Sequence, residues 1–104
     1  MNDEQVDSTI LRSQLARLDF LRTDLALGKT FVDLAITEMD IGQFDAARRV
    51  LAKDEQGYAT IQRMVLNLDN AHHQNEILQR LGELRAAIDA AHQWLGVREG
   101  TPEP

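Results

Sequence analysis

Apolar residues return every seven positions in three successive segments of the chain, and each segment has a second apolar row three or four positions from the first. In an α-helix, residues seven apart lie two turns apart on one face, so each pair of rows forms one apolar stripe. The first rows are Leu11, Leu18, Leu25, Val32 and Met39; Phe44, Leu51, Tyr58 and Val65; and Ile77, Leu84 and Ala91. The second rows are Leu21, Gly28 and Ala35; Ala47, Ile61 and Leu68; and Leu81, Ile88 and Leu95. The pattern predicts an all-α protein, an antiparallel bundle of three long helices.

The predicted helices span about residues 8–41, 43–68 and 71–95. Gly42 can adopt the left-handed conformation that ends a helix, and Asp69-Asn70 can supply the next turn and a helix cap. Gly96 is expected to end the third helix. Residues 1–7 and 96–104 are polar, and the second stretch carries both prolines, so both are predicted to be disordered ends of a single domain that covers residues 8–95.

Gly28 allows two interpretations of the first segment. It can end one helix, with Thr30 capping the next, which would give a four-helix bundle. Alternatively one helix runs through Gly28, at a cost of about 1 kcal/mol relative to alanine. The row from Leu25 to Val32 keeps its phase across the glycine, and no proline lies nearby. The sequence therefore favours one continuous helix.

Charge and composition exclude several classes of function. The 104 residues carry a formal net charge of −6, which disfavours nucleic acid and anionic membrane surfaces as partners. No apolar run approaches the roughly 20 residues that span a bilayer. The polar start of the chain lacks the apolar core of a signal peptide, so a cytoplasmic location is expected. The absence of cysteine excludes disulfides and thiolate chemistry.

The stretch from Phe31 to Leu51 resembles a single tetratricopeptide-type helical hairpin. The residues that carry the resemblance are Phe31, Leu34, Ala35, Gly42, Phe44, Ala47 and Leu51. It covers about a fifth of the chain, and it departs from the family pattern at Glu38, where an aromatic residue is usual, and at Asp54, where a small alanine is usual. No second copy follows, although solenoids need about three stacked repeats. The resemblance implies a hairpin built into a bundle, with a binding or scaffolding role.

The three histidines do not form a convincing metal site. Two Asp-x-Ala-His segments recur twenty residues apart, with Asp69 three residues before His72 and Asp89 three residues before His92. Each pair shares a helical face, but twenty residues of helix span about 30 Å, so one chain cannot bring both pairs to one ion. No metal and no cofactor is predicted.

The segment that begins at Ala71-His72 resembles a histidine phosphotransfer domain, also through the later Leu81-Gly82. That resemblance implies an alternative function, with His72 as the phospho-acceptor. The family supplies a lysine and a glycine three and four positions after the histidine, where this chain has Asn75 and Glu76. A carboxylate beside the acceptor would repel phosphate.

Asp54 falls in the apolar row of the second segment. Buried there, its carboxylate would need a partner such as Arg22 or Lys29 on the first helix. The alternative is a helix end at which Asp54 reaches water, and this is what we expect. The nearby basic residues Arg48, Arg49 and Lys53 are expected to lie on an exposed face and to pair with acidic neighbours.

The first segment carries a further apolar row on another side, again with a spacing of seven. This row and its neighbour form a candidate interface of Phe20, Leu27, Phe31, Leu34 and Ile41. Either the first helix touches both other helices, or part of this band stays exposed and closes a homodimer. No nucleophile–base pair, phosphate loop or carboxylate cluster can be assembled. The sequence predicts a non-enzymatic interaction or scaffolding module whose partner is another protein or a second copy.

Overall fold

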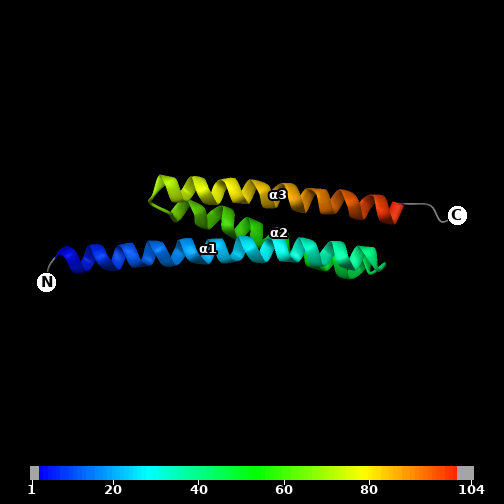
Figure 1. Cartoon of the computed structure of the whole chain (residues 1–104), viewed down its shortest axis with the longest axis horizontal. Coiled ribbons are helices and arrows are strands. Elements are labelled where there is room, and N and C mark those ends of the chain that lie inside the picture. The colour runs from blue at the N-terminus through cyan, green and yellow to red at the C-terminus, as the bar shows by residue number, and fades with distance from the viewer. Residues whose placement is uncertain (1–2, 101–104) are drawn as a thin grey trace.

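The computed structural model describes residues 3–100, with side chains from residue 8 onward. Its helices are α1 (Asp3–Asp40), α2 (Phe44–Met64) and α3 (Ala71–Gly100), and a short 3₁₀ turn, η1 (Val65–Asn67), follows α2. The helices run antiparallel along one long axis, with α2 folded back between the long helices α1 and α3 (Figure 1). The described part of the chain contains no strand. The predicted all-α bundle of three long helices is confirmed.

Helix α1 runs through Gly28 without a break, as the phase of its apolar row predicted. Gly28 is buried. A Cβ atom at this position would lie 2.8 Å and 3.1 Å from the two methyl carbons of Leu84 on α3, and 3.0 Å from Oδ1 of Asp54 on α2. Side chains from both other helices therefore pack directly against the backbone of α1 at Gly28.

Both turns use the residues that the sequence indicated. Gly42 has a φ of 80°. Its N–H donates to the carbonyl of Met39 at 3.0 Å, and the N–H of Gln43 donates to the carbonyl of Glu38 at 2.8 Å, which satisfies the last carbonyls of α1. At the second turn, Oδ1 of Asn70 accepts from the N–H of His73 at 3.1 Å, so Asn70 caps α3.

Two predicted helix ends are wrong. Helix α1 begins at Asp3 rather than near residue 8, and no proline or glycine interrupts the earlier residues. Helix α3 continues through Gly96 to Gly100. Its last turns have partners on the other helices, because Arg98 pairs with Asp40 at 3.0 Å and Glu99 pairs with Arg48. Residues 1–2 and 101–104, also predicted to be disordered, lie outside the described residues.

The predicted apolar rows form the core with few exceptions. The buried apolar residues are Leu18, Leu21, Leu25, Val32, Ala35, Met39, Ala47, Leu51, Ile61, Val65, Leu68, Ile77, Leu81, Leu84, Ile88, Ala91 and Leu95. Leu11 belongs to the first row but is 59% exposed. The N-terminal part of α1 projects beyond the turn that joins α2 to α3 (Figure 1). Leu11 lies beside this turn, where it lines an open pocket together with Asp69, Asn70 and His73.

Candidate interaction surface

The outer face of α1, opposite the core, carries a row of large apolar side chains in contact with solvent. Phe20 is 48% exposed, Leu27 47%, Leu34 43% and Ile41 65%. Helix α1 does contact both other helices, but it does so through other faces, so the account that buries this row inside the bundle is wrong. Phe31, the fifth residue of the predicted interface, is half-buried beside α2.

A second row on the same face consists of small, uncharged residues, all of them exposed: Ala16, Thr23, Thr30 and Thr37. The hydroxyl of Thr30 donates to the carbonyl of Ala26 at 3.1 Å, and that of Thr37 donates to the carbonyl of Asp33 at 3.0 Å. These hydroxyls already have partners, so the surface can be covered without leaving their donors unsatisfied. The spacing of apolar residues alone does not reveal this row.

Together the large and small rows form what we call the outer stripe, residues 16, 20, 23, 27, 30, 34, 37 and 41. The spacing alternates between four and three, which is the repeat of a helix seam that packs against another helix. No charged residue lies on it. Its edge toward α2 carries Arg17, Asp24, Phe31 and Glu38, and its edge toward α3 carries Asp19, Ala26, Asp33 and Asp40.

A separate apolar groove of about 410 Å³ lies between α1 and α3. Val32 and Ile36 form its wall on α1, and Ala87, Ala90 and Trp94 form its wall on α3. Trp94 is 46% exposed, and its ring lies 5.3 Å from the guanidinium carbon of Arg98. The small alanines leave space between the two helices, so this groove is a second apolar surface, on another side of α1 from the outer stripe.

Asp54 is buried in the middle of α2, so the expectation that it sits at a helix end in water is wrong. It is 2% exposed, and its Oδ2 atom has no hydrogen-bond partner among the described residues. Neither suggested partner reaches it: Arg22 binds Glu76 at 2.6 Å and 2.7 Å, and Lys29 lies 3.6 Å from Glu83. The side chain instead borders a slot of about 100 Å³ between α1 and α2.

Burial first, and the neighbouring negative charge of Glu55 second, raise the pKa of Asp54 to about 6 against the opposing effect of Arg85. Removing a carboxylate from water disfavours its charged form, which is the physical cause of the first effect. Asp54 is thus the one buried charged residue among the described side chains.

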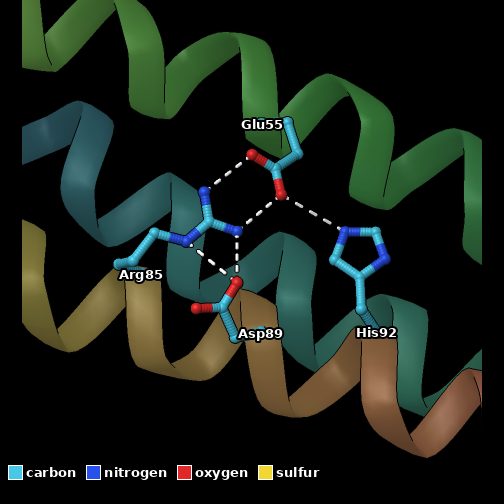
Figure 2. Close-up of polar contacts among 4 residues, drawn as sticks. All are labelled: Glu55, Arg85, Asp89 and His92. Carbon is cyan, nitrogen blue, oxygen red and sulfur yellow. Dashed lines mark hydrogen bonds and ion pairs between the residues drawn. The ribbon is translucent and has the colours of Figure 1, made fainter.

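A polar network joins α2 to α3 beside Asp54 (Figure 2). The guanidinium of Arg85 donates two hydrogen bonds to the carboxylate of Glu55, at 2.6 Å and 2.7 Å, and two to Oδ1 of Asp89, at 2.6 Å and 3.0 Å. Nε2 of His92 lies 3.3 Å from Glu55, and the guanidinium carbon of Arg85 lies 4.9 Å from the centre of the Tyr58 ring. Donation by Arg85 lowers the pKa of Glu55.

Replacing Arg85 by methionine is expected to destabilise the bundle by about 1 kcal/mol at neutral pH, because the forked interaction with Glu55 is partly exposed to solvent. The lowered pKa of Glu55 means that this stabilisation is present above the ordinary glutamate pKa and is lost as pH falls through the lowered value. Urea denaturation across the acid range tests this. The variant should lose less stability on acidification than the wild type, and an equal loss in both proteins would contradict the role of the pair.

The histidines do not assemble into a site. His72 is exposed at the start of α3, and the carboxylate four residues later, Glu76, is paired with Arg22. Asp89, whose spacing places it on the same helical face as His92, binds Arg85. Within the described residues no group of three or more histidine, cysteine, aspartate or glutamate side chains is arranged to hold a metal ion.

Comparison with known proteins found no matching family model, no matching curated protein and no matching solved structure. None of the helices in the described part of the chain has the length and apolar content needed to cross a membrane.

Proposed function

We propose that this protein is a non-enzymatic interaction module that works by self-association through the outer stripe of α1. The observation that carries the proposal is the exposed row of Phe20, Leu27, Leu34 and Ile41, which has the spacing of a helix-packing seam and no charged residue on it. Apolar surface of this extent on a soluble helix is typical of a contact with another protein.

The α1–α2 hairpin gives a second support. Its resemblance to a tetratricopeptide-type hairpin implies a binding or scaffolding role, and the two small residues that the resemblance includes, Ala35 and Ala47, are both fully buried between the helices. A rigid hairpin would hold the outer stripe straight, because the inner face of α1 is fixed by the core while the outer face remains available.

Light scattering over a range of concentrations tests the proposal. The monomer mass is 11.7 kDa, so the wild type should approach twice that mass as its concentration rises. The double variant Leu27→Ser, Leu34→Ser should remain monomeric, because each substitution removes an exposed apolar anchor. It should fold normally, because neither residue belongs to the core.

Leu66→Ser and Trp94→Ser are matched controls, because both residues are exposed apolar side chains away from the outer stripe. Both controls should dimerise like the wild type. A monomeric wild type at all concentrations would contradict the proposal, as would dimerisation that Trp94→Ser abolishes and the double variant retains. Labelling of His72 by a phosphodonor, lost in His72→Gln, would favour phosphotransfer instead.

A further inference from the structure

The two rows of the outer stripe differ consistently in size. One row, at positions 20, 27, 34 and 41, holds phenylalanine, leucine or isoleucine, and the other, at positions 16, 23, 30 and 37, holds alanine or threonine. All eight residues are exposed. The stripe therefore presents a line of large side chains beside a line of shallow positions, over about 37 Å of helix at 1.5 Å per residue.

The relative direction of two such stripes decides which rows meet. In a parallel pair each row faces its own copy, so layers of two large side chains would alternate with layers of two small ones, and the helices could not keep one separation. In an antiparallel pair the large row of each copy faces the small row of the other. Every layer then holds one large and one small side chain, which packs at uniform density.

We infer that the partner on the outer stripe is a second copy of this chain, with its α1 antiparallel to the first and in one particular register. This inference rests on the proposed function and adds the geometry of the contact. In this register Phe20 faces Thr37 of the second copy, and Leu27 faces its Thr30. Leu34 then faces Thr23, and Ile41 faces Ala16. All four large residues of each copy are used.

Charges along the edges fit this register. On the edge toward α2, Arg17 of each copy approaches Glu38 of the other. Neither residue has an ion pair among the described residues. Arg17 donates a hydrogen bond to the carbonyl of Asn67 at 3.4 Å, and Oε2 of Glu38 is buried without a hydrogen-bond partner among those residues, so the contact requires both side chains to turn outward. On the edge toward α3, Asp19 approaches Asp40 of the second copy, but Asp40 already carries Arg98 at 3.0 Å, which offsets the repulsion. The two Arg17–Glu38 contacts therefore dominate.

Sliding one copy by a heptad loses this balance. Asp24 would then face Asp24 of the second copy, and Asp19 would face Asp33. Among the described residues, Asp24 and Asp33 have no ion pair, and Asp19 has only a contact with Arg22 at 3.8 Å. Like charges at these edge positions oppose association. The outer stripe is only about 10 Å wide, so the contact area between the two copies is small. We therefore expect reversible dimerisation with a dissociation constant in the micromolar range.

Disulfide trapping tests the orientation, because the natural chain has no cysteine. Phe20→Cys and Thr37→Cys would be made as separate proteins and oxidised mildly, each alone and as an equal mixture. The antiparallel register brings position 20 of one protein opposite position 37 of the other, so the mixture should give several-fold more cross-linked dimer than either protein alone. Mass spectrometry of the linked peptides identifies which positions are joined.

The outcomes separate the geometry from the proposed function. Efficient cross-linking of Phe20→Cys with itself would indicate a parallel pair, which overturns this inference and leaves self-association intact. Light scattering that shows only monomer would overturn both. Dimers of normal mass without a 20–37 cross-link would overturn the register alone.

Charge exchange gives an independent test of the edge contact. Arg17→Glu and Glu38→Arg should each weaken dimerisation several-fold, and the double variant should restore it, because both signs of the contact are exchanged together. Arg63→Glu, an equal charge change on the exposed surface of α2, is the control and should leave the dimer unchanged. Failure of the double variant to recover would overturn the Arg17–Glu38 pairing and the register that depends on it.

Discussion

Replacement of Asp54 by leucine is expected to raise the free energy of unfolding by about 3 kcal/mol at about pH 8, the largest effect of any single substitution considered. Asp54 is 2% exposed, lacks a partner for Oδ2, and has its pKa raised from 3.8 to about 6. Leucine has the same branching as aspartate, so its two methyl groups replace the two carboxylate oxygens against Leu84 and Gly28. A buried charge without a partner is exchanged for apolar contact.

The pH dependence follows from the direction of the pKa shift. The folded protein holds the Asp54 proton more tightly than the unfolded chain does, so a protonated Asp54 favours folding. As far as Asp54 determines it, the free energy of unfolding is therefore at its highest below about pH 4 and falls as the pH rises through about 6. Glu55, next in the chain, has the opposite linkage because Arg85 lowers its pKa. The two neighbours therefore favour opposite ends of the pH range.

Urea denaturation from about pH 4 to 8 measures both effects. Asp54→Asn cannot ionise, so its stability should be nearly independent of pH through this range, although its unpartnered amide keeps it less stable than Asp54→Leu. Asp33→Asn, at an exposed position of α1, is the matched control and should keep the wild-type profile. If the wild type shows no loss of stability between pH 4 and 7, Asp54 is not buried as described.

Gly28→Ala is expected to destabilise the bundle by about 1–3 kcal/mol, even though alanine is the better helix former by about 1 kcal/mol. The new Cβ would lie 2.8 Å and 3.1 Å from the two methyl carbons of Leu84 and 3.0 Å from Oδ1 of Asp54, so the side chains of both residues would have to shift. Leu84 is fully buried, so its displacement would disturb its packing in the core. Overpacking should therefore outweigh helix propensity.

Gly82→Ala is the matched control, because Gly82 lies in α3 with no atom within 4 Å of the position its Cβ would take. It should stabilise the protein by about 0.5–1 kcal/mol, the gain from helix propensity alone. Thermal unfolding of the two variants side by side should move the midpoint in opposite directions. A rise in both midpoints would show that α1 and α3 are further apart at Gly28 than the structure places them.

The sequence predicted the helices correctly where the period of the apolar residues determines which face is buried. The phase from Leu25 to Val32 predicted a continuous α1, and Gly42 and Asn70 marked the turns correctly. The errors lie where local residue type and tertiary contact disagree. Gly96 was predicted to end the third helix. In the structure α3 continues to Gly100, because Arg98 and Glu99 form ion pairs with residues of the other helices.

The candidate surface was predicted only in part. The seven-residue spacing identified Phe20, Leu27, Leu34 and Ile41, yet the same spacing is equally consistent with a buried row. That spacing did not reveal the row of small residues, because three of its four members are threonines, which are not classed as apolar. Its relevance depends on exposure and on where its hydroxyl groups bond, and neither property is encoded in the spacing of residues.

The sequence by itself determined the helical periodicity, the composition of the core and the two turns, because these follow from which face of each helix must avoid water. Only the tertiary structure decided the rest. It determined that Asp54 is buried with no partner for its Oδ2 atom among the described residues, that Gly28 is a contact point of three helices, and that the outer stripe of α1 is exposed. These properties depend on the distances between helices and on the number of helices that surround α1, and a one-dimensional pattern of apolar residues specifies neither quantity.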